Sequence, residues 1–262
     1  MIERAYCTVA HGQMHYRHSE MGKRPLQRPL ILLHQTPSSS AMYEALMAEL
    51  MSDFTCITPD TPGFGQSDSL VGEQTVAGYA TAVSQCLQKL DISKCFVFGH
   101  HTGASIAVQL TVDHPELVSK LILSGPPLLT EAQINYLKTT LPAMELDENG
   151  RFLNDLWQRL RSKDTDVSLE LALRETVAAL QCRDNYHAAY HAVFAQDFTG
   201  QLTQIDCPVL LMAGEQDSLR ASLEPAAALV KNGRVEIIPD AGTYICDQKP
   251  QIVAQHLRKF LL

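Results

Sequence analysis

Two adjacent histidines, His100 and His101, stand between Gly99 and Gly103 in the segment FVFGHHTGASIA. The apolar residues before them are typical of a buried strand, and the residues after them are typical of a helix. This spacing is that of a G-x-S-x-G turn, in which a sharp bend between strand and helix exposes the central side chain. The exposed residue here is His101, at the position where that motif has a nucleophilic serine. An imidazole at this bend predicts chemistry by proton transfer.

Further aromatic and histidine side chains occupy the segment CRDNYHAAYHAVF. Tyr186 and Tyr190 are four residues apart, as are His187 and His191, so each pair shares one face of a helix. The pattern is typical of an amphipathic helix that packs one aromatic face against the core, and we expect this of at least one pair. A tyrosine or histidine of the other pair would reach over His101 as a proton donor or a substrate clamp.

The histidines of this helix also bear on metal binding, because two histidines at i and i+4 are a common part of a zinc site. His100 or His101 would have to supply a further ligand. Such sites usually have an acidic ligand nearby and a recognisable motif, and the sequence has neither. We therefore predict no metal site and no cofactor.

The elements that must position these residues alternate between short apolar runs and helical patterns. The expected strands cover residues 6–10, 13–17, 30–33, 54–58, 95–98, 120–123, 208–213 and 234–238, and the expected helices cover 40–51, 75–90, 102–113, 223–231 and 250–262. The first two strands form an antiparallel hairpin. The alternation of strands and helices elsewhere predicts an α/β fold with a mostly parallel twisted sheet and helices on both faces.

Residues 128–201 differ from the rest, because they have long helical patterns and no strand pattern. We interpret them as a helical cap over the carboxyl-terminal edge of the sheet, where open α/β sheets bind ligands. Residues 1–127 and 202–262 then form the α/β core. Trp157 belongs to an expected cap helix and is a candidate for lining the substrate entrance, although core packing is the commoner fate of such a side chain.

Composition and charge narrow the classes of partner. The chain of 262 residues is 45% hydrophobic and 19% charged, which is typical of a folded globular protein. Its net charge of −8 offers no electrostatic reason to bind nucleic acid or an anionic membrane surface. No apolar run has the length of a membrane helix, and the start MIERAYCTVAHGQ lacks the apolar core of a signal peptide. The partner that we expect is a small-molecule substrate, and a homodimer is left open.

The cysteines indicate the compartment. They are odd in number and widely scattered, and no two of them form a C-x-x-C pair. Such a pattern predicts thiols that fill the core in a reducing environment, in place of a disulfide framework. We therefore expect a cytoplasmic protein.

Five segments, in this order along the chain, resemble landmarks of the α/β-hydrolase family: LILLHQTPSSS, PDTPGFGQSD, FGHHTGA, LMAGEQD and IIPDAGTYICDQKP. In that family the first segment supplies an oxyanion-hole N–H group, the third is the nucleophile elbow, the fourth has the catalytic acid and the fifth has the catalytic histidine. The resemblance covers essentially the whole chain and implies the α/β-hydrolase fold. It also implies that Asp217 is the acid and that the backbone N–H groups of Thr36 and Thr102 form the oxyanion hole.

Three positions depart from the family pattern. His101 replaces the serine, Thr243 replaces the catalytic histidine and is followed by Tyr244, and Gln35 replaces the glycine of H-G-x-P. The usual serine–histidine relay therefore cannot operate in this chain. Gln35, Thr243 and Tyr244, together with His100, are candidates for shaping the substrate pocket.

In one hypothesis, the replacement of serine by His101 and the replacement of the catalytic histidine by Thr243 compensate each other. An imidazole at the bend reaches roughly 3 Å further from its Cα than a serine hydroxyl does. The ring of His101 would extend into the space that Thr243 leaves free and would contact Asp217 directly or through one water. A carboxylate partner fixes the tautomer of an imidazole and so favours its use as a general base.

A base next to an oxyanion hole, without a serine, suits two reactions of a small carbonyl compound. One is proton abstraction next to the carbonyl, as in a lyase or an isomerase. The other is direct activation of water, as in a hydrolase. A covalent acyl-imidazole at His101 is less favoured, because such adducts are labile and a second base would be needed. The alternative to an enzyme is a pseudohydrolase that only binds a small molecule, but the gain of an ionisable group beside Asp217 favours catalysis.

Overall fold

The computed structural model describes residues 1–19, 28–142, 145–164 and 166–262, and these contain a sheet of eight strands. The strands are Ile2–Val9 (β1), Gly12–Ser19 (β2), Leu30–Leu33 (β3), Cys56–Pro59 (β4), Cys95–His100 (β5), Val118–Ser124 (β6), Val209–Gly214 (β7) and Gly233–Ile238 (β8). They lie in the order β1-β2-β4-β3-β5-β6-β7-β8. β2 pairs with β1 and with β4 in antiparallel fashion, and all pairs from β4 to β8 are parallel. The predicted hairpin and the mostly parallel α/β sheet are confirmed.

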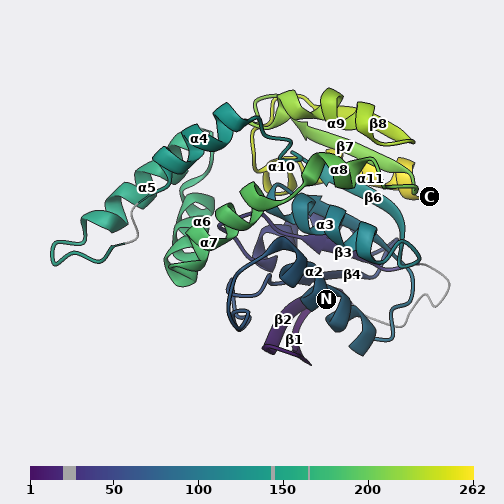
Figure 1. Cartoon of the computed structure of the whole chain (residues 1–262), viewed down its shortest axis with the longest axis horizontal. Coiled ribbons are helices and arrows are strands. Elements are labelled where there is room, and N and C mark those ends of the chain that lie inside the picture. Colours follow the sequence, from purple (N-terminus) through teal and green to yellow (C-terminus); the bar gives the residue numbers. More distant parts are fainter. Residues whose placement is uncertain (20–27, 143–144, 165) are drawn as a thin grey trace.

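The parallel strands are buried on both faces, which explains their nearly continuous apolar sequences. In β3, Leu30 and Leu32 face one side of the sheet, and Ile31 and Leu33 face the other. The first side is covered by α1 (Glu44–Leu50), α10 (Ile245–Gln248) and α11 (Pro250–Leu261), and the second by α2 (Val76–Lys89), α3 (Thr102–Asp113) and α9 (Leu223–Leu229) (Figure 1). Two short 3₁₀ helices, η1 (Ser40–Tyr43) and η2 (Arg220–Ser222), precede α1 and α9.

The chain between β6 and β7 is helical, and no strand occurs in the described part of it. Its helices are α4 (Glu131–Thr140), α5 (Arg151–Lys163), α6 (Leu169–Cys182), α7 (Asn185–Ala195) and α8 (Phe198–Leu202). In Figure 1, α4 and α5 extend away from the sheet, whereas α7 and α8 run back toward α3. The predicted helical cap is therefore confirmed.

Apart from β3, the strands differ in their bounds from the sequence prediction by one or more residues, and hydrogen bonding explains the differences in β4 and β5. β4 begins at Cys56 and not at Phe54, because the Phe54 N–H donates to Leu50 O at 2.9 Å and still belongs to the turn that ends α1. β5 runs on through His100, beyond the predicted end, since its ladder with β6 continues to the pair of His100 and Ser124. The strand thus leads directly into the bend that begins α3.

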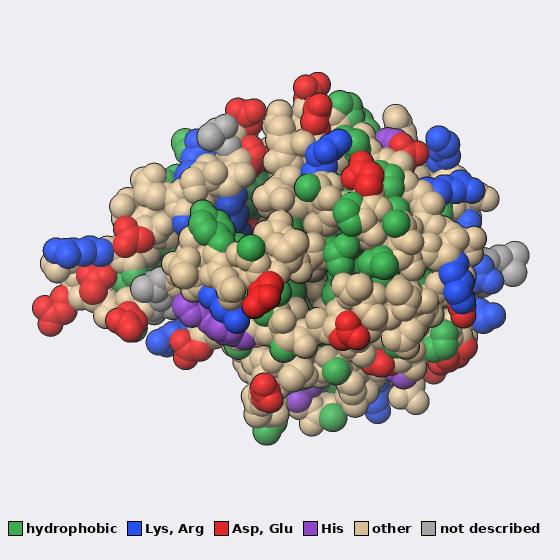
Figure 2. Space-filling view, turned by 45° about the horizontal axis from the view of Figure 1, so that its top comes forward, with side chains coloured by type: hydrophobic (Ala, Val, Ile, Leu, Met, Phe, Trp, Pro, Cys, Tyr) green, Lys and Arg blue, Asp and Glu red, His purple; other side chains and the backbone are tan. Residues whose placement is uncertain are grey.

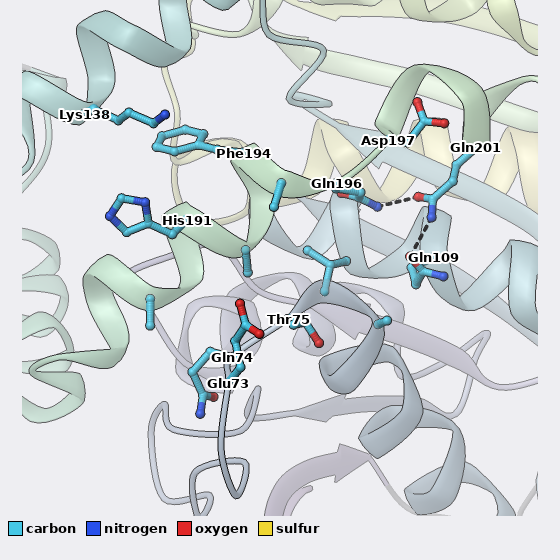
Figure 3. A pocket seen from close by; sticks show the side chains of 15 residues that line it. Glu73, Gln74, Thr75, Gln109, Lys138, His191, Phe194, Gln196, Asp197 and Gln201 are labelled. Atoms are coloured by element: carbon cyan, nitrogen blue, oxygen red, sulfur yellow. Dashed lines mark hydrogen bonds between the residues drawn. The ribbon is translucent and has the colours of Figure 1, made fainter.

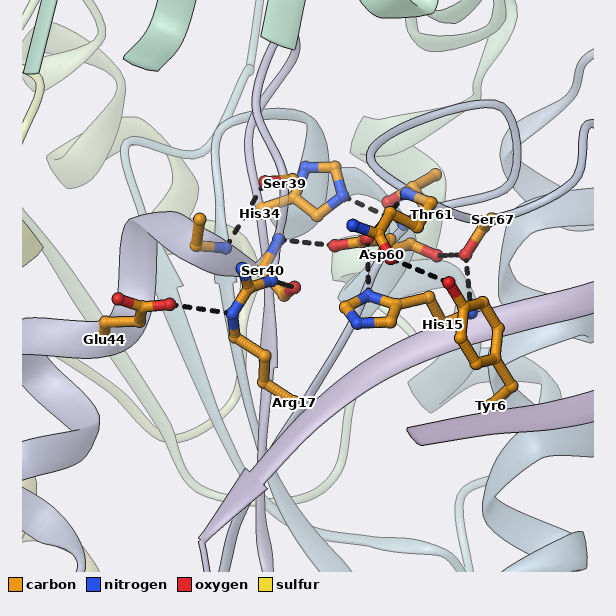
Figure 4. A network of polar contacts seen from close by, with 12 residues as sticks. Tyr6, His15, Arg17, His34, Ser39, Ser40, Glu44, Asp60, Thr61 and Ser67 are labelled. Atoms are coloured by element: carbon orange, nitrogen blue, oxygen red, sulfur yellow. Dashed lines mark hydrogen bonds and ion pairs between the residues drawn. The ribbon is translucent and has the colours of Figure 1, made fainter. Parts of the chain in front are cut away.

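A buried carboxylate joins three segments near the end of β4. Asp60 accepts hydrogen bonds from the backbone N–H groups of Ser40 at 2.6 Å and Gln66 at 2.9 Å, and it pairs with His15 Nδ1 at 2.7 Å (Figure 4). Burial raises the pKa of Asp60, but the His15 hydrogen bond, the nearby His34 and the Ser40 hydrogen bonds outweigh it and lower the pKa to about 2. Asp60 therefore stays ionised and holds β2, η1 and the loop after β4 together.

The surface and the thiols complete the description. Side chains of both signs occur on the face that Figure 2 shows. None of the helices in the described part of the chain is long and apolar enough to cross a membrane. The seven cysteines are all free; six are buried and Cys207 is half-buried, as expected for thiols that fill the core.

Candidate active site

His101 lies at the bend between β5 and α3, with φ of 50° and ψ of −112°, a conformation that side chains other than glycine rarely adopt. Its N–H donates to Ser124 O at 2.9 Å, which fixes the bend to the end of β6. The flanking glycines are required by packing, because a Cβ at Gly103 would lie 2.0 Å from Leu33 O and a Cβ at Gly99 would lie 2.2 Å from Gly103 O. The sharp bend predicted from the glycine spacing is present.

His101 contacts the carboxylate of Asp217 directly. Its Nε2 lies 2.9 Å from Oδ2 and 3.1 Å from Oδ1. Asp217 follows β7, and its side chain is fully buried, whereas 17% of the His101 side chain is exposed. Oδ1 also accepts the Leu219 N–H at 2.7 Å, which fixes the carboxylate. The direct contact between the bend and the acid was one of the two arrangements expected from the sequence.

This contact determines which ring nitrogen can exchange a proton. In the neutral ring, Nε2 donates its N–H to Asp217, and Nδ1 keeps a free lone pair. Burial raises the pKa of Asp217, but the charge of His101 and its hydrogen bond outweigh burial and hold the pKa below its usual value. Asp217 is therefore ionised at neutral pH and leaves Nδ1 as the nitrogen available for proton transfer.

His100 supports the ring of His101 from below. The two rings stack with centroids 4.3 Å apart, and His100 Nδ1 is hydrogen-bonded to Ser124 Oγ at 2.8 Å. His100 is fully buried. Burial and the adjacent His101 lower its pKa to about 3, so its imidazole is neutral at physiological pH. His100 does not line the cavity described next, and its role in the structure is packing beneath His101.

A cavity of about 370 Å³ opens above the bend, within the range of roughly 300–1,000 Å³ that small-molecule sites occupy. The core contributes His101, Thr102, Thr36 and Thr243 to its wall. The cap contributes side chains from α4, α5 and α7, including Tyr190. The cavity thus lies at the carboxyl edge of the sheet, between core and cap, where the sequence predicted a ligand site.

Thr36 and Thr102, the residues expected to form an oxyanion hole, both line the cavity. Thr102 begins α3, and the first N–H groups of a helix have no acceptor within the helix. Thr36 precedes a cis peptide bond to Pro37. Neither N–H makes a hydrogen bond to another of the described residues. Two backbone N–H groups without an acceptor among the described residues therefore belong to residues of the cavity wall.

The loop that contains Thr36 is held by His34. Its Nε2 accepts the Thr61 N–H at 2.9 Å, so the neutral ring must have its proton on Nδ1, which donates to Gln35 O at 2.8 Å. Burial lowers the pKa of His34, which keeps the ring in this neutral form. His34 therefore links the Thr36 loop to the end of β4.

Several predicted substrate-binding residues do not line the cavity. Gln35 and Tyr186 are buried, and Tyr186 lies behind Tyr190, whose ring stacks on it at a centroid distance of 5.6 Å. Tyr244 packs with Val167 and Ala172 in a small core at the start of α6, and Trp157 packs against this core. The tyrosine and the tryptophan fill a core here and offer no contact to a ligand in the cavity.

The two histidines of α7 also point elsewhere. His187 Nε2 donates to Pro142 O at 2.6 Å, and His191 lies with Lys138 and Phe194 around a second, open hollow of about 670 Å³ (Figure 3). Successive helical residues differ by about 100° in direction, so these histidines do not share the helix face on which Tyr186 is buried and Tyr190 reaches the cavity. Neither lines the cavity above the bend.

Among the residues of the cavity wall that sequence reasoning missed are the two cations of α5, Arg159 and Lys163. Their spacing of four, in RLRSK, was a visible signal, because residues at i and i+4 share a helix face. The same spacing is typical of a solvated helix surface, so the sequence alone does not show that this face meets a cavity.

Donor atoms of His100, His101 and Asp217 lie within 4.8 Å of one another, as in a small metal site. The ring planes of the two histidines differ by only 27° and the rings are stacked, so their in-plane lone pairs lie in separate, nearly parallel planes. Such lone pairs are poorly placed to bind one ion. Each ring also has a hydrogen-bond partner, Ser124 for His100 and Asp217 for His101. This geometry fits a hydrogen-bonded pair better than a metal centre.

Known proteins resemble this chain in sequence. Residues 28–250 match the sequence model of the family described as alpha/beta hydrolase fold. An uncharacterised protein of Mycobacterium tuberculosis is 33% identical over 114 residues, which are 43% of this chain and 33% of that protein, so the match spans about a third of the first curated relatives. A 2-(acetamidomethylene)succinate hydrolase of Mesorhizobium japonicum is 25% identical over 261 aligned residues, 92% of this chain and 90% of that protein.

Solved structures show the same architecture. The crystal structure of wild-type Cfl2 from Burkholderia cenocepacia is similar with a TM-score of 0.81 and a sequence identity of 21%. The similarity covers 100% of this chain and 96% of that one. At this level of identity the likeness concerns the fold.

Proposed function

Since this chain belongs to the alpha/beta hydrolase family, we propose that it is an enzyme that hydrolyses a small carbonyl compound with His101 as its general base. The central observation is the contact of 2.9 Å between His101 Nε2 and Asp217 Oδ2 at the wall of the cavity. Hydrolysis is favoured over lyase or isomerase chemistry because the Mesorhizobium japonicum relative, similar over nearly its whole length, is named a hydrolase.

In the proposed reaction the nucleophile is water. A water molecule in the cavity gives a proton to His101 Nδ1 as its oxygen attacks the carbonyl carbon. Asp217 stays ionised and accepts the Nε2–H, so the imidazolium that forms is stabilised. When the tetrahedral intermediate collapses, the proton on Nδ1 passes to the leaving atom, and the ring returns to its neutral state.

The charge that develops on the carbonyl oxygen is matched by the backbone N–H groups of Thr36 and Thr102. These donors are part of the folded chain before substrate arrives, so no reorganisation is required during the reaction. Their contribution does not depend on the residue at the bend, since backbone donors are independent of side-chain identity. Oxyanion stabilisation therefore survives the replacement of serine by His101.

The test compares the wild type with His101→Gln on small lactones and 4-nitrophenyl esters. A general base of this kind contributes roughly 10²–10⁴-fold, and we expect a loss of that size in kcat/KM. The matched control is His191→Gln, which removes an exposed histidine outside the cavity and should leave the rate unchanged. Circular dichroism and thermal unfolding show whether each variant keeps its fold.

Three outcomes would count against the proposal. Equal rates for wild type and His101→Gln would exclude the base. Trapping of an acyl-enzyme by hydroxylamine, with its mass on His101, would replace the water mechanism with a covalent one. Ligand-dependent thermal stabilisation without turnover of any substrate would assign the chain to the binding proteins.

A further inference from the structure

The cavity above His101 has a charge of one sign. Apart from the titratable His101, the charged side chains among the described residues that line it are Arg159 and Lys163. No described Asp or Glu lines the cavity. Both cations belong to α5, one turn or about 6 Å apart along its axis, so their head groups face the same space. The end of the cavity under α5 is therefore cationic.

These cations lack a counter-charge in the described part of the protein. Arg159 donates from Nε to Tyr186 Oη at 3.4 Å and from Nη1 to Thr140 O at 2.5 Å, which are uncharged acceptors. Arg159 also has a side-chain hydrogen bond with Tyr190, again an uncharged partner. These contacts use fewer than the five N–H donors of the guanidinium. Neither Arg159 nor Lys163 forms an ion pair with a described carboxylate, and Lys163 Nζ donates no hydrogen bond to a described residue. Donors of both side chains thus remain available.

Lys163 remains charged in this setting. Burial lowers its pKa, but Coulombic interactions with Tyr190, Tyr186 and Tyr244 outweigh burial and raise the pKa above its usual value. Its positive charge also contributes to the low pKa of His100, although burial and the charge of His101 contribute more. The ammonium group therefore lies within electrostatic reach of the proposed base.

Half-buried cations without a partner are costly, and proteins usually retain them where a ligand supplies the opposite charge. Arginine offers a planar fork that suits a carboxylate, and lysine adds a mobile point charge. The rest of the wall includes Leu137, Val193 and Phe194, which suits a short hydrocarbon chain better than a strongly hydrated phosphate.

We propose that the substrate is a small carboxylic acid, whose carboxylate binds Arg159 and Lys163 while its reactive carbonyl lies over Thr36 and Thr102. The assignment of the carbonyl end rests on the proposed function. The assignment of the carboxylate end rests on α5 alone. Arg159 and Lys163 are thus residues that determine specificity, and they take no part in proton transfer.

Binding measurements test the carboxylate end without any need for turnover. The probes for isothermal titration calorimetry are glutarate, its uncharged dimethyl ester and diamide, and inorganic phosphate. We expect glutarate to bind with one molecule per chain and the uncharged analogues to bind at least tenfold more weakly. Lys163→Met and Arg159→Gln should each weaken glutarate at least tenfold, Lys163→Arg should restore most of the affinity, and Arg151→Gln, on the same helix but outside this cavity, should have no effect.

The proposal is overturned if the esters or the diamide bind as well as glutarate, if phosphate binds more tightly than glutarate, or if Lys163→Met and Arg159→Gln bind normally while folded. Failure of this proposal and failure of the proposed function are distinguishable. If the protein shows no preference for carboxylates but still turns over neutral esters with full dependence on His101, only the proposed substrate class is wrong. Charge-dependent binding of glutarate without any turnover removes only the catalytic proposal.

Discussion

The imidazole of His101 lies directly against Gly125, the residue that follows β6. A Cβ at position 125 would be 2.5 Å from both Cδ2 and Nε2 of His101 and 3.4 Å from Asp217 Oδ2. Gly125 has φ of 55°, and its N–H donates to Met212 O at 2.8 Å, so its backbone cannot easily move away. The missing side chain creates the space in which the ring meets the carboxylate.

Gly125→Ala should therefore displace the His101 ring and reduce kcat/KM at least tenfold. The control is Gly72→Ala, because Gly72 also has a positive φ, of 88°, but a Cβ there would have no heavy atom within 4 Å. Both variants bear the backbone cost of a positive φ, roughly 1 kcal/mol, and only the first touches the site. Equal kinetics in the two variants would show that the position of the ring does not matter.

Asp217→Asn tests the tautomer of His101. The amide NH₂ of asparagine would donate to Nε2, which moves the ring proton to Nδ1 and removes the lone pair of the proposed base. We expect a loss of roughly 10²–10⁴-fold in kcat with little change in KM. Steady-state kinetics measure both, and a variant with normal kcat would contradict the assignment of Nδ1.

His100 makes stability depend on pH. Its pKa is about 3 in the folded protein, below the value of about 6.5 for a histidine in an unfolded chain. Between these values the unfolded chain binds a proton that the folded chain does not, so the free energy of unfolding falls as the pH falls, by about 1.4 kcal/mol per pH unit.

The His100→Asn variant cannot bind this proton. Its free energy of unfolding should therefore decline less between pH 7 and pH 5 than that of the wild type. Urea unfolding of both proteins at each pH measures the difference, and the other titrating groups cancel because they are common to both. Parallel declines would mean that His100 is protonated in the folded state.

Asp60→Asn should destabilise the fold, because it leaves His15 without its buried charge partner. Removing one member of a buried pair costs about 3–5 kcal/mol. Asp206→Asn is the control, since its carboxylate is 74% exposed and such changes stay within about 0.5 kcal/mol. The measurement is the free energy of unfolding in urea, and similar values for the two variants would assign Asp60 no role in holding the loops.

The sequence alone was sufficient for the succession of the eight strands along the chain, for a helical cap between the sixth and seventh strands, and for the bend at His101. Apolar periodicity identifies elements, and Gly99 and Gly103 mark a close approach of backbones that any larger residue would prevent. The bounds of β4 and β5 were less predictable, because the Phe54 N–H bonds back to Leu50 O at the end of α1 and the ladder of His100 depends on β6. Residue propensities register neither.

Which side chains share the cavity was decided only by the tertiary structure. The types and positions of His101 and Asp217 are written in the chain, but their contact depends on β5 and β7 ending at the same edge of one sheet. The cap is a stronger example. A helical repeat predicts which side chains share one face of a helix, but it does not predict which part of the protein that face contacts. Packing placed Tyr244 in a small core and placed Arg159 and Lys163 in the wall of the cavity, because each segment buries the face that best fits its neighbours.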